Sequence, residues 1–233
     1  MPDLLLREHI KQSLTSLLDE AEVIVDERLA GLALKQNDYR FVNTSYRAAI
    51  REAMTAYIDG GSAQAQKNVF KRSIFRLFPE AFQIGYGEGG GDELNIDPEA
   101  SAWLNSRMES EIGFVDELFT SLKNTRDMID AKVMKRDEAQ AIIVQRVDGY
   151  SGGMDGVYNA GKMWGAKNQM LTWHLGATEE HCSTCAMLNG KAHRAKWYIF
   201  HDYIPRKPGA AMECKGYRCA CWMTNKKGER VTL

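Results

Sequence analysis

Hydrophobic positions in the first part of the chain recur every three or four residues, a spacing that predicts helices. Residues 4–35 form the longest such stretch, with apolar side chains on one stripe and charged side chains largely off it. Residues 43–58 predict a second helix, which starts at Asn43 or Thr44 and ends before the glycine pair at 60–61. Ser62 is placed to cap a third helix that runs to about residue 77.

The segment "GYGEGGGDELNID", residues 85–97, interrupts this helical pattern. Five of its first seven residues are glycine, and each interior glycine costs a helix about 1 kcal/mol relative to alanine. A phosphate-binding loop is excluded because no Gly-Lys-Ser/Thr sequence follows, and Glu88 and Asp92 would repel phosphate. The segment is therefore predicted to be a flexible loop.

Helical periodicity resumes at Pro98, a residue type suited to the first turn of a helix, and continues to about residue 123. A further helix is expected over residues 126–147, with an interruption at "DGYSGG" and a continuation in small and aromatic residues. Three small residues in that continuation would allow close approach of another backbone: Gly156, Ala160 and Gly165.

The pattern changes after Met170. The stretch "MLTWHLG" alternates, with Leu171, Trp173 and Leu175 on one face, which predicts a strand. Short segments, two prolines and many glycines follow. We therefore expect a mainly α protein with two parts, a helical body over residues 1–170 and a small C-terminal α+β module over residues 171–233.

Composition places the chain in the ordinary globular class, with 233 residues, 44% hydrophobic and 26% charged. No apolar run approaches the roughly 18 residues that span a membrane, and the charged start "MPDLLLREHIKQ" does not read as a signal peptide. The protein is thus expected to mature in a reducing cytoplasm, where clustered cysteines bind metal more often than they form disulfides.

The net charge of −1 is unevenly distributed. Residues 174–233 hold ten Lys and Arg against five Asp and Glu, a net +5, so the rest of the chain carries −6. The basic end suggests contact with an acidic surface or with nucleic acid, although a simply solvated face is the alternative. The candidate residues for non-specific DNA contact are Lys191, Arg194, Lys196, Arg206, Lys207, Lys215 and Arg218.

All five cysteines lie within the last 52 residues. They form a C-x-x-C pair and a second group further along: Cys182, Cys185, Cys214, Cys219 and Cys221. Zinc takes about four sulfur or nitrogen ligands in a tetrahedron, and small modules with little apolar content are often stabilised by it. The sequence therefore predicts a zinc site, with His181 and His201 as reserve ligands. A disulfide pair or reduced packing cysteines remain the alternatives.

Two arrangements of the second cysteine group are possible. In an extended segment, Cys219 and Cys221 point to the same face and could both reach one ion. Alternatively, Cys214 and Cys219 flank a loop that turns at Gly216, and Cys221 stays free.

Known zinc and redox enzymes fit the sequence poorly. A thioredoxin-like site would need a parallel sheet that nothing after Cys182 supplies. A zinc deaminase needs H-x-E ahead of P-C-x-x-C, but neither His9 nor His174 begins H-x-E, and His181 occupies the proline position. A His-Asn-His nuclease is not indicated by His193 and His201. No enzymatic activity is therefore expected.

The stretch over residues 136–233 resembles the C-terminal part of tailed-phage head morphogenesis proteins, the Mu-F-like minor head proteins. Their pattern is a helix ending near Arg, a helix with N-A-G, a strand with Trp, a C-x-x-C turn followed by Gly, and a final C-x-C. The matching residues here are Arg146, Asn159–Ala160–Gly161, Trp173, Cys182, Cys185, Gly190, Cys219 and Cys221. Two positions depart from the pattern: Val147-Asp148 replaces Thr-Glu after Arg146, and no Asp precedes the C-x-x-C pair.

This resemblance implies a structural role. Such proteins are minor virion components that associate with the portal or major capsid protein and act in head assembly and DNA packaging or delivery. The chain would then be assembled in the host cytoplasm and reside in the virion. The alternatives are a zinc-dependent nuclease or deaminase, and a cytosolic zinc module that binds nucleic acid.

Overall fold

The computed structural model describes residues 38–177, 180–216 and 219–232, which pack as one compact unit. The helix expected over residues 4–35 lies outside this part of the chain. The elements in order are α2 (Tyr39–Ile58), α3 (Ala63–Glu88), α4 (Pro98–Asp130), α5 (Arg136–Gly165), β1 (Met170–His174), α6 (Ser183–Leu188), β2 (Ala192–Arg194), α7 (Ala195–Phe200) and β3 (Trp222–Thr224).

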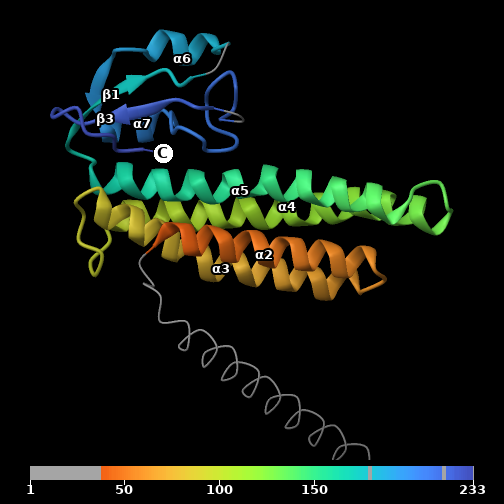
Figure 1. Ribbon diagram of the computed structural model, residues 1–233. Coiled ribbons are helices and arrows are strands. Elements are labelled where there is room, and N and C mark those ends of the chain that lie inside the picture. The colour runs from red at the N-terminus through yellow and green to blue at the C-terminus, as the bar shows by residue number, and fades with distance from the viewer. Residues whose placement is uncertain (1–37, 178–179, 217–218, 233) are drawn as a thin grey trace, which may run out of the picture. The chain divides into compact units, whose positions relative to one another are not determined.

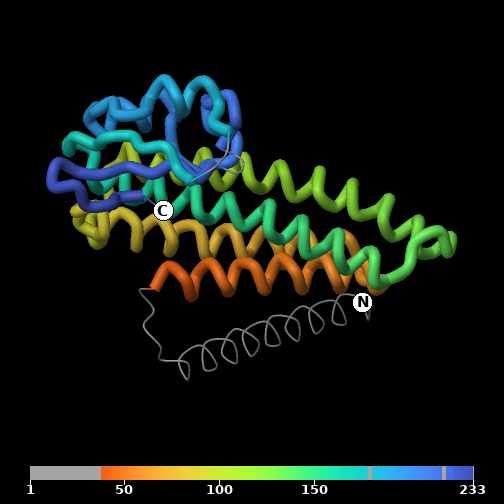
Figure 2. Tube along the Cα trace, turned by 45° about the horizontal axis from the view of Figure 1, so that its top comes forward, coloured from red at the N-terminus to blue at the C-terminus, as the bar shows by residue number. Residues whose placement is uncertain are grey.

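Four long helices, α2 to α5, form a bundle, and the C-terminal module lies against α5 (Figures 1 and 2). The bundle encloses an aromatic core in which Tyr46 packs 5.4 Å from Phe78, and Tyr57 lies 5.4 Å from Phe119, between ring centroids. The predicted fold class is thus confirmed as mainly α with a small C-terminal sheet. Within the described residues, no helix has the length and apolarity that a membrane span requires.

The first described helix begins four residues earlier than predicted. Asp38 caps α2, since its carboxylate accepts a hydrogen bond from the backbone N–H of Arg40 at 2.9 Å. The helix ends as expected at Ile58, and Gly60 then adopts a φ of +106°. Ser62 caps α3, as predicted, by accepting from Ala65.

The third helix continues well past residue 77 and includes the first glycines of the segment 85–97. The predicted loop is therefore wrong over residues 85–88. A Cβ at Gly85 would lie 2.3 Å from the carbonyl oxygen of Tyr158 on α5, and one at Gly161 would lie 2.3 Å from that of Phe82 on α3. Backbone packing between α3 and α5 explains why glycine is accommodated within both helices.

The two following helices also differ from their predicted bounds. Helix α4 begins at Pro98 as expected but ends at Asp130, and α5 runs from Arg136 to Gly165 without the expected break at residues 148–153. Val147, Ser151 and Met154, in and beside that segment, are buried. Packing of this kind favours a continuous helix despite the glycines. The predicted close approach at Gly156 is confirmed, since a Cβ there would lie 2.7 Å from the Cα of Lys207.

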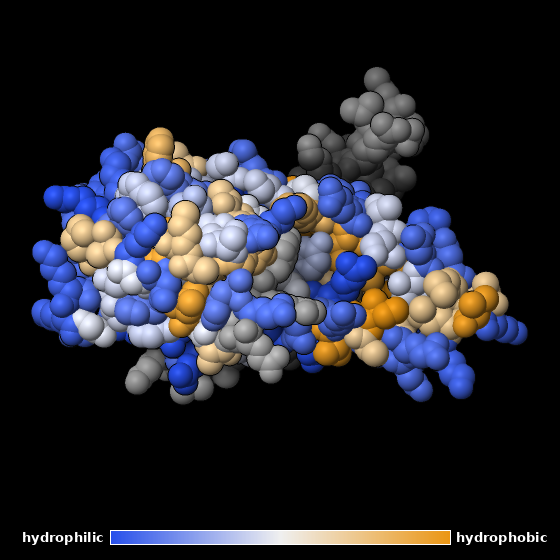
Figure 3. Space-filling view, turned by 90° about the horizontal axis from the view of Figure 1, so that it is seen from above, coloured by the Kyte–Doolittle hydropathy of each residue, from blue (hydrophilic) through white to orange (hydrophobic). Residues whose placement is uncertain are grey.

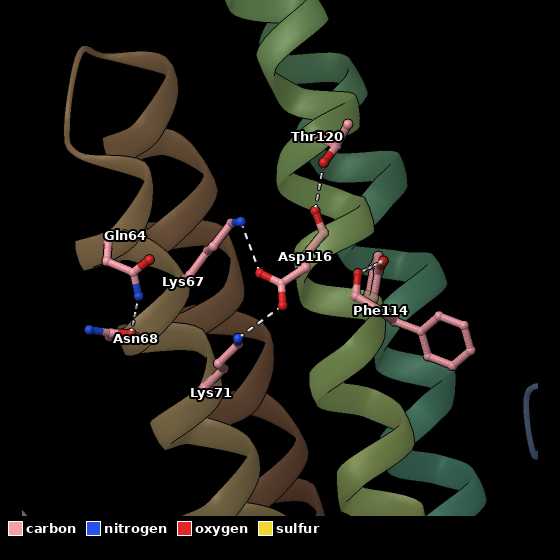
Figure 4. Close-up of polar contacts among 8 residues, drawn as sticks. Gln64, Lys67, Asn68, Lys71, Phe114, Asp116 and Thr120 are labelled. Carbon is pink, nitrogen blue, oxygen red and sulfur yellow. Dashed lines mark hydrogen bonds and ion pairs between the residues drawn. The ribbon is translucent and has the colours of Figure 1, made fainter.

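Exposed ion pairs join α3 to α4 (Figure 4). The Asp116 carboxylate lies 2.9 Å from the Lys67 ammonium and 3.1 Å from that of Lys71, and the hydrogen bonds from these lysines lower the pKa of Asp116. Such exposed pairs contribute at most about 1 kcal/mol each. The stability of the bundle therefore comes from its core.

The module is built on a three-stranded antiparallel sheet in the order β2-β1-β3. Leu171 and Trp173 on β1 are fully buried, which confirms the predicted alternation of this strand. Trp173 lies 6.0 Å from Tyr198 of α7 between ring centroids, so the short helix covers the buried face of the sheet.

Candidate metal centre

The C-x-x-C pair is placed by the start of a short helix. Cys182 is the N-cap of α6, and its sulfur accepts a hydrogen bond from the backbone N–H of Cys185 at 3.4 Å. Because the capping side chain folds over the first turn, both sulfurs face the same side. Helix α6 is held to β1 by Gly190, whose N–H donates to the carbonyl of Trp173 at 2.9 Å and whose φ is +74°.

Glu213 brings the third cysteine to this turn. Its carboxylate accepts from the backbone N–H of Ser183 at 2.7 Å, and its own N–H donates to the hydroxyl of Thr184 at 3.2 Å. Cys214 follows directly in the chain. Sequence reasoning did not single out Glu213, since the only signal was an acidic residue next to a cysteine.

The five cysteines gather into two triads that share one residue. Cys182, Cys185 and Cys214 form the first triad, and Cys185, Cys219 and Cys221 form the second, with the sulfurs of each triad within 4.8 Å of one another. The five form no disulfide in the described structure. All the predicted ligands thus meet at one locus, with Cys185 at its centre.

Both arrangements considered for the second group are partly realised. The loop does turn at Gly216, where φ is +72°, yet Cys219 and Cys221 both belong to the triad with Cys185. Cys221 is therefore not remote from the cluster. Neither His181 nor His201 belongs to the two triads.

The centre of the cluster is shielded from solvent. Cys185 is 2% exposed and Cys221 is 1% exposed. Hydrogen bonds from the thiols of Cys185 and Cys219 lower the pKa of Cys221 to about 3, while donation to Cys219 and Cys221 raises the pKa of Cys185. The cluster therefore favours a thiolate at Cys221 beside thiols that keep their protons. A metal ion that binds to the cluster would displace those protons.

The loop that carries Cys214 rests on α5. The buried side-chain amide of Asn159 donates to the carbonyl of Pro205 at 3.0 Å, and Gly156 leaves room for the backbone of Lys207. At the other end of the loop, a Cβ on Gly216 would lie 1.9 Å from the carbonyl oxygen of Lys207. The cysteine cluster and the helical body are therefore joined by direct backbone packing.

Comparison with known proteins adds no family to this description. Neither the protein-family models, nor the curated proteins, nor the solved structures gave a match to this chain. Its function must therefore be inferred from its own residues.

A soft, all-sulfur donor set characterises the cluster. Thiolates select zinc, copper(I) and iron–sulfur clusters over the hard oxygen-binding cations. Cysteine sulfur is the only donor type in the two triads, and a full set of four thiolates would close a tetrahedral site. The arrangement is therefore suited to a structural metal.

The predicted DNA-contacting residues occupy different environments. Lys191, Arg194, Lys196 and Lys215 are exposed, Arg206 is partly buried, and Arg218 lies outside the described residues. The ammonium of Lys196 lies 3.6 Å from the carboxylate of Glu99. Lys207 is buried, at 8% exposure, and its ammonium lies 2.8 Å from the carboxylate of Asp202. The charge of Lys207 is therefore compensated within the chain.

A buried ion pair lies on α4, near Lys207. Arg107 and Glu111, one helical turn apart, are 7% and 3% exposed and form a salt bridge. Burial raises the pKa of Glu111, although the adjacent Arg107 and the more distant Lys207 favour its charged form. Burial also lowers the pKa of Lys207. Each charge in this group therefore depends on its neighbours.

Removing one partner of the Arg107–Glu111 pair should lower the free energy of unfolding strongly, whereas replacing both partners with apolar residues should lower it less. We expect Glu111→Met alone to lower the free energy of unfolding by about 3 kcal/mol, because Arg107 then stays buried without its carboxylate. The double variant R107M/E111M should lose less than the sum of the single variants in urea denaturation. The same comparison of single and double variants at the exposed pair Lys123–Asp127, also on α4, should show a far weaker interaction energy. Strict additivity at Arg107 and Glu111 would contradict the description.

Proposed function

We propose that this chain is a non-enzymatic minor head protein of a tailed phage, acting in head assembly and in DNA packaging or delivery. The supporting observation is that residues matching the minor head pattern also build the C-terminal module and its contact with α5. Asn159 holds the loop before Cys214, Trp173 is buried in the sheet, and Gly190 ties α6 to that sheet. Under this proposal, the residues that match the minor head pattern serve to stabilise the C-terminal module and to attach it to α5.

We further propose that the metal is zinc, bound by Cys185 and three of the other cysteines. Cys182 and Cys214 share the more exposed triad with Cys185, and the two triads have only Cys185 in common. A tetrahedral site would therefore need Cys219 or Cys221 to move closer to Cys182 and Cys214 when the ion binds. Four thiolates leave no open position and place so much negative charge on the ion that a bound water would be poorly acidified. The metal would therefore stabilise the module and would not catalyse a reaction.

A pocket beside the cysteine cluster bears on the enzyme alternative. A cavity of about 600 Å³ between α5 and the module is lined by Cys219, Asp148, Asp155 and Arg206, among others. Both of its carboxylates have partners, because Asp155 accepts from Tyr39 and Asp148 pairs with Arg47. We expect no nuclease or deaminase turnover from the wild-type chain. Turnover that disappears in either Asp155→Asn or Glu180→Gln would favour the enzyme instead.

The structural role can be tested in virions of the phage that encodes this chain. Mass spectrometry of purified particles should detect the chain together with the portal and major capsid proteins. Complementation with Glu180→Gln should restore infectivity, whereas Cys185→Ser should not, because only the latter removes a metal ligand. Particles that assemble, package DNA and infect without the chain would contradict the proposal. Recovery of the chain only from the cytosol, bound to nucleic acid, would favour the cytosolic module.

A further inference from the structure

A basic pocket lies at one end of the module's sheet. Its volume is about 310 Å³, and its polar lining consists of three cationic side chains and three amides: Arg194, Lys226, Lys227, Asn168, Gln169 and Asn225. No carboxylate lines it among the described residues. Of these three cations, only Arg194 is among the residues predicted to contact DNA.

Strand register brings these residues together. Met170, the first residue of β1, pairs with Arg194 on β2, while Thr172 pairs with Thr224 on β3. Because both pairings are antiparallel, Arg194 and the turn that follows Thr224 flank the start of β1 on opposite sides. This turn is the dark blue loop at the left of Figures 1 and 2.

The backbone around the pocket is well fixed. The Asn225 side chain accepts from the N–H of Lys227 at 2.9 Å and from that of Glu229 at 3.1 Å, and Gly228 takes a φ of +79°. On the other side, the Arg194 guanidinium donates to the carbonyl of Asn168 at 3.4 Å. The two lysines therefore extend from a defined turn.

Ion pairing distinguishes these three cations from two other lysines of the module. Among the described residues, no carboxylate lies within ion-pair distance of Arg194, Lys226 or Lys227, in contrast to Lys196 and Lys207. Hydrophilic side chains cover this end of the module in Figure 3. Two of the lining amides already donate within the chain, Asn225 to the Glu229 carboxylate at 2.7 Å and Gln169 to the carbonyl of Gly89 at 3.2 Å. The attraction for an anionic ligand therefore comes from the three positive charges of this concave site.

We propose that this pocket binds the phosphates of a nucleic-acid backbone. The inference rests on the DNA contact in the proposed function and places that contact at the end of the sheet. Cations on two separate segments, β2 and the turn after β3, suit successive phosphates of a polymer, and each contact adds affinity that falls with salt. The described helices of the module, α6 and α7, have six residues each and are too short to read base edges along a groove, so binding is independent of sequence.

Salt-dependent binding of a short mixed-sequence DNA duplex tests this site. Fluorescence anisotropy with the full-length, metal-loaded chain should give a log–log salt slope that is less steep by about 2 in K226A/K227A, since each lysine contributes about 1. Arg194→Gln should reduce the slope by about 1. The control R40A/R51A removes two exposed positive charges from α2 and should leave the slope unchanged.

Several results would overturn the inference. An unchanged slope in both pocket variants, or no DNA binding by the wild type at low salt, would contradict it. Competition by inorganic phosphate, but not by chloride at equal ionic strength, would indicate a site for a single free phosphate instead. Metal content and virion incorporation are measured separately, so a chain that enters virions without binding DNA would refute this site and leave the head role intact.

Discussion

Replacing Cys185 with serine is expected to abolish metal binding and to unfold the C-terminal module. Cys185 belongs to both triads, so a tetrahedral site built from either of them requires its sulfur. Structural zinc contributes about 10–16 kcal/mol to the folding of small zinc modules, which exceeds the stability of most domains. Aromatic contacts such as Tyr46 with Phe78 and Tyr57 with Phe119 join the bundle helices to one another, so the bundle should stay folded. Hydrogen exchange should show lost protection in β1 and α6, with protection retained in α2 and α3.

Matched substitutions sharpen this expectation. Met187→Ala changes a half-exposed side chain on the same short helix and should leave both metal content and exchange unaffected. Of Cys219→Ser and Cys221→Ser, one should lose the metal and the other should retain it, which would identify the fourth ligand. A Cys185→Ser protein that keeps its full metal content would rule out the shared-cysteine site.

Substitution of Gly161 by alanine should be among the most damaging single changes in the bundle. The new methyl group would lie 2.3 Å from the carbonyl oxygen of Phe82, and an oxygen in the backbone of α3 cannot move aside as a flexible side chain can. The two helices must separate, which we expect to lower the free energy of unfolding by about 3 kcal/mol. Urea denaturation of the purified chain measures this loss.

Gly149 on the same helix provides the control. A Cβ there would meet nothing within 4 Å, so Gly149→Ala should only improve helix propensity and raise stability by up to about 1 kcal/mol. The two substitutions are chemically identical but should change stability in opposite directions. Equal effects would mean that α3 and α5 do not touch through their backbones.

Local signals predicted the elements that depend on local interactions. Ser62 and Pro98 mark helix starts because a cap and a first-turn proline act within a few residues of the chain. Asp38 was missed because Asn43 and Thr44 offered equally good caps further on. The continuity of α3 and α5 through their glycines could not be predicted, since it depends on contacts such as Gly85 with Tyr158, far apart in the sequence.

The candidate sites also divide into features that short-range sequence patterns predict and features that depend on contacts between distant residues. Residue type and spacing alone indicated the cysteine cluster, because C-x-x-C and C-x-C are short-range patterns. Charge counting could not separate Lys207, which is buried against Asp202, from the exposed basic residues. It also could not join Arg194 to Lys226, because only the register of β1 with its two neighbours brings them to one pocket.

X-ray absorption at the zinc edge, combined with elemental analysis, tests the central claim most directly. The full-length chain should be purified under reducing conditions without a chelator. We predict one zinc per chain, coordinated by four sulfur atoms at about 2.3 Å, with Cys185 among its ligands. Protein that contains no metal, or zinc bound mainly by nitrogen and oxygen, would contradict a module closed by its cysteines.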